Sequence, residues 1–144
     1  MTPDSPPAPG WTFVFLAWLI ATIATLSALF LGEVMGYTPC VLCWYQRIAM
    51  FPLVLVLVAG LFPFDRRVVR YALPLVVAGW LLAVFHLALI AGWIPEGLKP
   101  CQQGVSCSQA QVVLFGWVNI PLLSVLAFSS IFGLLVAASH KEAQ

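Results

Sequence analysis

Two cysteines, Cys40 and Cys43, precede an arginine, Arg47, at a spacing that could support redox chemistry. Residues three or four positions apart on a helix are neighbours, so the two thiols could form a disulfide and Arg47 would share the face of Cys43. A C-x-x-C pair at a helix N-terminus has a lowered thiol pKa, which favours disulfide exchange. An arginine inside a long apolar segment is costly and usually marks a functional site. The pattern therefore predicts a redox-active disulfide beside a small-molecule electron acceptor.

A second cysteine pair, Cys101 and Cys107, lies in a segment that contains glycine and several polar residues. Either pair could be purely structural: the second could staple a loop, and the first could be a stabilising bridge or two buried thiols. A bridge that closes so short a loop as the first stabilises a fold little, because the entropic gain grows with loop length. An exposed bridge in a polar loop is open to attack by another thiolate. We therefore expect a catalytic role for all four cysteines.

Three further side chains are candidates for binding the electron acceptor. Arg47 could favour the Cys43 thiolate and donate a hydrogen bond to a quinone carbonyl, although an arginine near the end of a span could also extend toward the membrane interface. Gln46 could contact the acceptor or a neighbouring helix. His86 lies deep in a later apolar segment, where a histidine serves as an interhelical partner or as a proton relay. We expect no bound metal ion.

The composition is typical of an integral membrane protein. Hydrophobic residues make up 62% of the chain and charged residues only 8%, against about 25% charged residues in soluble domains. A net charge of +1 offers no basic surface for nucleic acid. Several apolar segments reach the roughly 20 residues that a membrane-spanning helix needs. We predict a single all-α domain, a bundle of four transmembrane helices, with spans at about residues 11–31, 41–62, 71–94 and 112–138.

The polar segments predict the orientation of the bundle. Residues 1–10 are rich in proline and predict a flexible tail. Three of the six basic residues lie between the second and third spans and another lies in the C-terminal tail, whereas the opposite loops, 32–40 and 95–111, contain a single lysine. By the positive-inside rule, both termini are then cytoplasmic. All four cysteines would lie on the outer side, where disulfides persist.

The segment CVLCWYQR, from Cys40 to Arg47, resembles the signature of the DsbB/BdbC disulfide bond formation proteins. The resemblance extends over nearly the whole chain: four spans, both termini inside, one cysteine pair at the second span and the other in the loop before the fourth. The short segment GVSC that ends at Cys107 and the segment GWVNIP at 116–121 are similar to the compact BdbC branch.

This resemblance implies a function in the plasma membrane of a prokaryote. A secreted thioredoxin-like oxidase, similar to DsbA or BdbD, would attack a Cys101–Cys107 disulfide. Electrons would pass by thiol–disulfide exchange to a Cys40–Cys43 disulfide. Cys43 would then deliver them, with the help of Arg47, to a bound quinone, either ubiquinone or menaquinone.

Two other classes of function stay open at this point. A compact four-span transporter would need an intramembrane carboxylate to couple protons, and we expect no Asp or Glu within a span. A metal-binding subunit with structural cysteines could use thiolates of both pairs as a Cys₄ zinc site. Against this, the five residues between Cys101 and Cys107 are a loose spacing, and an oxidising compartment works against free thiolates.

Overall fold

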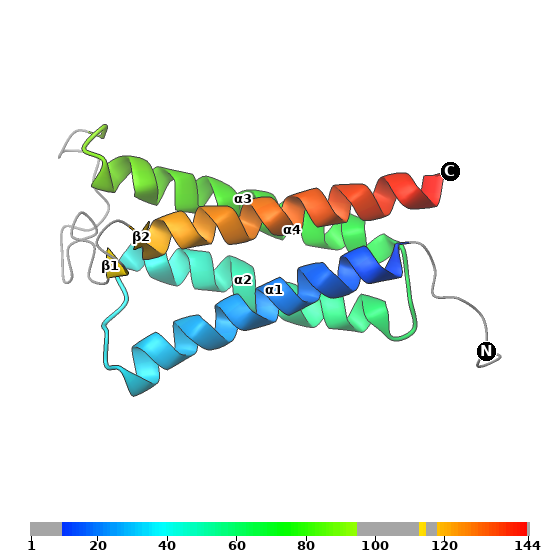
Figure 1. Cartoon of the computed structure of the whole chain (residues 1–144), viewed down its shortest axis with the longest axis horizontal. Coiled ribbons are helices and arrows are strands. Elements are labelled where there is room, and N and C mark those ends of the chain that lie inside the picture. The colour runs from blue at the N-terminus through cyan, green and yellow to red at the C-terminus, as the bar shows by residue number, and fades with distance from the viewer. Residues whose placement is uncertain (1–9, 95–112, 115–117, 144) are drawn as a thin grey trace.

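The computed structural model describes residues 10–94, 113–114 and 118–143, and these form a bundle of four long helices (Figure 1). Helix α1 spans Trp11–Leu29 and continues as a π-helical segment, η1, over Phe30–Val34. The other helices are α2 (Val41–Leu61), α3 (Arg67–Ile90) and α4 (Ile120–Ala143). Each helix packs against the next, and α4 also packs against α1. The prediction of an all-α four-helix bundle is confirmed.

One short β-pair precedes α4. Strands β1 (Val113–Leu114) and β2 (Val118–Asn119) are antiparallel and contain two residues each. They lie at the end of the bundle where α2 begins, which we call the cysteine end (Figure 1). The start of α1 and the end of α4 lie together at the opposite end, as an even number of antiparallel spans requires.

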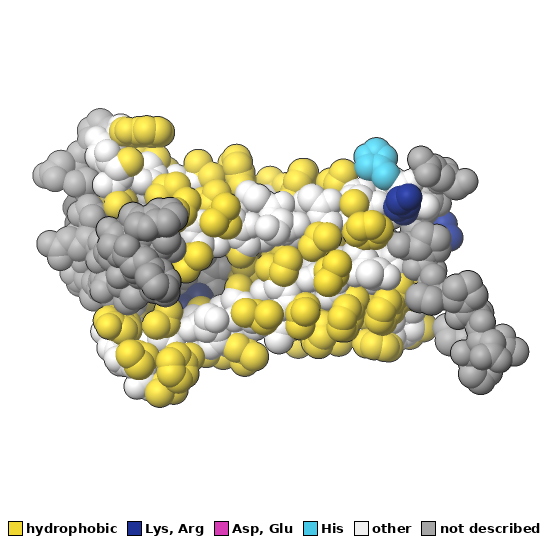
Figure 2. All heavy atoms as spheres, in the orientation of Figure 1, with side chains coloured by type: hydrophobic (Ala, Val, Ile, Leu, Met, Phe, Trp, Pro, Cys, Tyr) yellow, Lys and Arg dark blue, Asp and Glu magenta, His cyan; other side chains and the backbone are white. Residues whose placement is uncertain are grey.

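All four helices are long and apolar enough to cross a membrane. Large apolar side chains also cover their outward surfaces; Leu26 is 60% exposed and Leu55 is 69% exposed. Figure 2 shows apolar side chains along most of the visible face between the two ends. A water-soluble bundle would carry polar residues there, so this surface matches the hydrocarbon of a bilayer. The prediction of a four-span membrane protein is confirmed.

Small residues let the four helices approach closely. Ala17, Ala21 and Ala83 are fully buried, and Gly79 of α3 faces the ring of Phe128 on α4. Association of helices in a membrane depends on such close contact, because lipid tails are as apolar as the side chains. The larger core residues fill the remaining space; they are Val14, Leu53, Leu57, Val76, Phe128, Ile131 and Leu135.

We expect Gly79→Ala to destabilise the bundle by about 1–3 kcal/mol, the usual cost of overpacking a core. A methyl group at this position would overlap the Phe128 ring. Gly133→Ala is the matched control, because a methyl group there meets no atom within 4 Å among the described residues. The measurement is the thermal unfolding midpoint of both variants in detergent. Equal midpoints for the two variants would contradict the close approach of α3 and α4.

Two helix starts differ from the predicted ones, and side chains near each start explain why. Helix α3 begins at Arg67, not near residue 71, and the Asp65 carboxylate accepts a hydrogen bond from the Arg67 N–H (2.9 Å). Helix α4 begins at Ile120, not near residue 112. There Asn119 Oδ1 accepts a hydrogen bond from the Leu122 N–H (3.0 Å), which is the usual N-cap contact.

The expectation that no acidic residue lies within a span is wrong for Glu33. The apolar segment of α1 continues through η1, so that the first candidate span covers Trp11–Val34 and includes this residue. The Glu33 side chain is exposed, in the last residues of the span. It therefore lies at the end of the membrane-crossing segment, away from the interior position that proton coupling would require.

Candidate functional site

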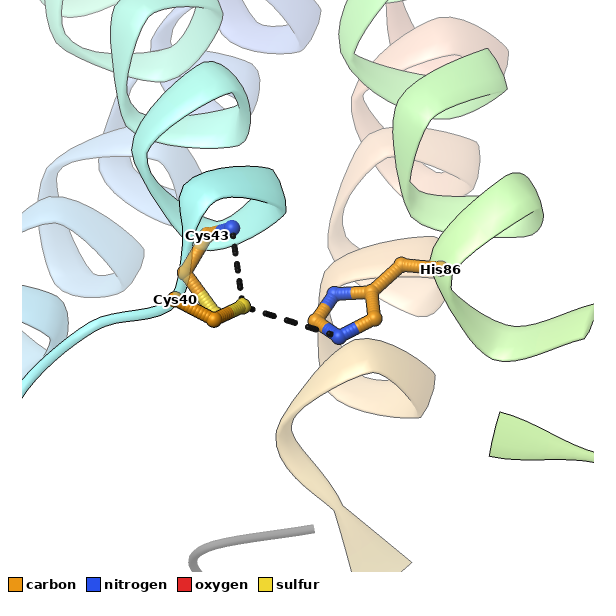
Figure 3. A group of neighbouring side chains, drawn as sticks. All are labelled: Cys40, Cys43 and His86. Carbon is orange, nitrogen blue, oxygen red and sulfur yellow. Dashed lines mark hydrogen bonds between the residues drawn. The ribbon is translucent and has the colours of Figure 1, made fainter. Parts of the chain in front are cut away.

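The start of α2 holds Cys40 and Cys43 together. Cys40 is the N-cap residue, in an extended conformation, and its Sγ accepts a hydrogen bond from the Cys43 N–H (3.4 Å). The Cys40 carbonyl accepts a second bond from the Trp44 N–H (3.1 Å). This capping geometry brings the two Sγ atoms to 2.9 Å, with both residues as free thiols (Figure 3). The predicted proximity of this pair is therefore present in the structure.

The surroundings of Cys40 favour its thiolate. The hydrogen bond with the Cys43 thiol is the main cause, and contacts with His86 and the Cys43 N–H act in the same direction. Burial opposes them, but together these contacts lower the pKa of Cys40 to about 4. Because the thiolate is the nucleophile in disulfide exchange, the reduced pair holds one sulfur ready to react at neutral pH.

His86 reaches the cysteine pair from α3. Its side chain is only 3% exposed, and its Nε2 lies 3.8 Å from Cys40 Sγ (Figure 3). On the other side of the ring, Nδ1 lies 3.1 Å from Nε2 of Gln46, which is also buried. Gln46 and His86 thus form one hydrogen-bonded pair between α2 and α3, and the histidine contacts the redox pair directly.

Arg47 lies between α1 and α2, next to the π-helical segment. Its Nη2 donates a hydrogen bond to the carbonyl oxygen of Ala28 (2.8 Å), and its guanidinium carbon lies 5.4 Å from the centre of the Trp44 ring. Gly32 of η1 is so close that a Cβ there would be 3.2 Å from Nη2. A glycine in the π-helical turn therefore makes room for the guanidinium.

A cavity of about 800 Å³ lies beside these residues. Cys40, Cys43, Gln46, Arg47 and His86 line one part of its wall. The remaining wall comes mostly from apolar residues of α1, η1 and α4, among them Ile20, Ile23, Ala24, Leu31, Ile120, Leu123, Ala127 and Phe128. Ligand sites of this kind are mostly apolar with a few convergent polar groups.

Five of the seven predicted site residues therefore surround one cavity. The other two, Cys101 and Cys107, lie outside the described residues, so their disulfide stays a prediction. Sequence reasoning missed the contributions of α1 and α4. Gly32 could have indicated the contact with Arg47, because a glycine near the end of a span often marks a close approach of another group. Nothing in the sequence indicated that the Ala28 carbonyl would accept a hydrogen bond from Arg47.

Comparisons with known proteins agree with this arrangement. The family model for disulfide bond formation protein DsbB matches residues 11–139. A probable disulfide formation protein of Metapseudomonas resinovorans is 52% identical over 127 residues, which cover 88% of each chain. Disulfide bond formation protein C of Bacillus subtilis is 41% identical over 118 residues, or 81% of this chain and 84% of the relative. A probable disulfide formation protein of Chlamydia muridarum is 37% identical over 129 residues, or 90% and 93%.

No solved structure matches the chain. The family match favours the redox interpretation of the cysteines over the transporter alternative. It also agrees with the four membrane-spanning helices and with the thiol pair at the start of the second. The chain therefore belongs to the DsbB family of disulfide bond formation proteins, and it is a disulfide oxidoreductase of the membrane.

Proposed function

We propose that this protein reoxidises a thioredoxin-like dithiol oxidase outside the cytoplasm and passes the electrons to a membrane quinone. The partner would be similar to DsbA or BdbD. It would exchange thiols first with the Cys101–Cys107 disulfide, and the electrons would then reach the Cys40–Cys43 pair. The result is the continued formation of disulfides in exported proteins.

One observation carries this proposal: the Cys40–Cys43 dithiol and the Arg47 guanidinium line the same, largely apolar cavity. The residues fit a quinone in both of its parts. An isoprenoid chain is apolar and suits the α1 and α4 walls, whereas the ring carries carbonyl oxygens that need a hydrogen-bond donor. Arg47 uses one guanidinium nitrogen for Ala28, and its fork offers further N–H groups.

The chemistry divides among the residues at this wall. Oxidation of the Cys40–Cys43 dithiol to a disulfide releases two electrons and two protons, and a quinone is a two-electron, two-proton acceptor. Arg47 would hold the acceptor carbonyl and favour negative charge there. His86 lies within contact of Cys40 Sγ and would take up a proton on Nε2 once the Gln46 amide has turned its oxygen toward Nδ1–H.

The charge distribution supports an outward-facing cysteine end. Arg66, Arg67 and Arg70 lie at or near the start of α3, and Lys141 lies near the end of α4. Both sites are at the end of the bundle opposite the cysteine end (Figure 1). By the positive-inside rule that end faces the cytoplasm. The protein would then be a multi-pass protein of a prokaryotic plasma membrane, with its thiols on the oxidising side.

The test uses two electron donors with the same purified protein in detergent. We expect absorbance at the quinone band to fall when either dithiothreitol or a reduced thioredoxin-like oxidase is added. In Cys101→Ser/Cys107→Ser, reduction driven by the protein donor should be lost, while reduction driven by dithiothreitol should persist through Cys40 and Cys43. We expect the two donors to differ because dithiothreitol is small enough to reach Cys40 and Cys43 directly, whereas the protein donor would need the Cys101–Cys107 pair.

The opposite result is equally informative. Folded wild-type protein that reduces no quinone with either donor would remove the quinone from the proposal. Loss of both activities in the double variant would mean that the loop pair is needed for folding or for all electron entry, and the proposed order of transfer would be wrong.

A further inference from the structure

The redox pair and His86 form a cluster whose geometry suits a metal ion. Sγ of Cys40, Sγ of Cys43 and a ring nitrogen of His86 all lie within 4.8 Å of one another. The two thiols come from the start of α2 and the imidazole comes from α3, so the cluster joins two helices (Figure 3). Two of the three residues are buried and the third is half-buried. A pair of cysteines separated by two residues is also a common zinc-ligand spacing.

The distances are close to those of a tetrahedral site. Zn–S bonds of about 2.3 Å and Zn–N bonds of about 2.05 Å imply separations of about 3.6 Å between sulfur and nitrogen and about 3.8 Å between the two sulfurs. The observed separation between Cys40 Sγ and His86 Nε2 is 3.8 Å. The two sulfurs are 2.9 Å apart, so roughly 0.9 Å of separation is needed, which a small rotation of one cysteine side chain provides.

Gln46 supplies the outer contact that metal-binding histidines require. Such a histidine donates its other ring N–H to an acceptor, which fixes the ring and the tautomer. The Gln46 side-chain amide lies against His86 Nδ1. An amide presents either NH₂ or its oxygen after a half-turn; with the oxygen facing Nδ1–H, Nε2 keeps its lone pair toward the cysteines. The same pair of residues therefore serves the free dithiol and a metal-bound state.

We propose that the reduced protein binds one soft divalent cation, such as Zn²⁺, through Cys40, Cys43 and His86, and that this binding inhibits it. All three residues line the same cavity, from which a fourth ligand such as water could reach the ion. Two thiolates neutralise the charge of the cation, which suits a site beside apolar helix walls. Binding displaces the thiol protons and transfers no electrons. A disulfide has no thiolate to offer, so oxidation and metal binding exclude each other, and the bound cation holds the pair reduced.

The test starts from Cys101→Ser/Cys107→Ser protein, which leaves Cys40 and Cys43 as the only thiols. Reduced protein in detergent is titrated with Cd²⁺, and thiolate-to-cadmium charge transfer is followed in the ultraviolet; Zn²⁺ affinity is measured by competition with a chromophoric chelator. We expect one ion per reduced chain and none after the pair has been oxidised. The oxidised sample has the same sequence and fold, so it is the strictest control.

Single substitutions in the same background identify the ligands. Cys40→Ser should weaken affinity and lower the charge-transfer absorbance per bound ion, because only one thiolate ligand then remains, and Gln46→Leu should weaken affinity about tenfold, as for other outer contacts of metal-binding histidines. His86→Ala should weaken it by at least as much. Ser130→Ala is the matched control and should bind like the parent, because its hydroxyl is exposed and donates to Leu126 O on its own helix.

Three results would overturn the proposal, given retained helix content by circular dichroism. The first is reduced protein that shows no charge-transfer band. The second is an unchanged band and an unchanged affinity in Cys40→Ser, which would show that Cys40 is not a ligand. The third is full affinity in His86→Ala, which would leave a bare dithiol without the third ligand. None of these measurements uses a quinone, so a failure here is distinct from a failure of the proposed electron transfer.

Discussion

Replacing Cys43 by serine should reduce quinone reduction to background, a loss of at least about 1,000-fold, because a hydroxyl cannot form or break a disulfide under these conditions. Cys40→Ser should be equally inactive. The two residues act as one unit, with Sγ atoms 2.9 Å apart, so Cys40→Ser/Cys43→Ser should be no worse than either single variant. Initial rates with dithiothreitol as the donor measure all three.

Serine is close to cysteine in size, so the fold should persist in these variants, which circular dichroism checks. Ser130→Ala should retain the wild-type rate, since Ser130 is exposed on α4 and bonded to its own helix. Substantial turnover in folded Cys43→Ser would show that electrons bypass the pair, and the proposed chemistry at the start of α2 would have to be abandoned.

Arg47→Ala should lower kcat for quinone reduction by about 100-fold, the usual effect of removing one charged or oriented donor from a site where negative charge develops. Arg47→Lys should recover part of this loss, because the ammonium keeps the charge but lacks the guanidinium fork. Arg47 also donates to the Ala28 carbonyl and lies against Gly32. A lysine would have to give up one of these contacts to reach the acceptor.

Arg70→Ala is the matched control for this substitution. Arg70 is exposed, belongs to the first turn of α3 and lies at the end of the bundle opposite the cysteines. Its removal also changes the net charge by one, but it should leave kcat unchanged. Equal rates for Arg47→Ala and wild-type protein would mean that Arg47 only holds α1 and α2 together and takes no part in quinone reduction.

The four helices were predictable because each is a long apolar segment in a chain with few charged residues. The starts of α3 and α4 were less predictable, because each depends on a single hydrogen bond to a side chain, that of Asp65 or Asn119. The overall hydrophobicity of a segment does not reveal such a contact. The π-helical continuation of α1 was missed for a similar reason: Gly32 and Glu33 suggested a loop, yet the helix continues to Val34.

The candidate site was likewise predictable only in part. Helical spacing alone placed Cys40, Cys43 and Arg47 together, because they belong to one turn or to neighbouring turns. The contact between Gln46 and His86 joins residues 40 positions apart, and only the packing of α2 on α3 brings it about. The walls from α1 and α4 could not be recognised, because an apolar residue facing a cavity and one facing lipid look alike in a sequence.

The π-helical turn at the end of α1 sets the rotational phase of the last residues of the first span. Such a turn accommodates one residue more than an α-helical turn, and each residue advances an α-helix by about 100°. If the same five residues followed the ordinary α-helical repeat instead, the residues beyond them would be rotated by about that amount. A residue with a side chain would then take the place of Gly32, which now lies beside the Arg47 guanidinium. The width of this turn and the glycine within it thus together give the arginine its room.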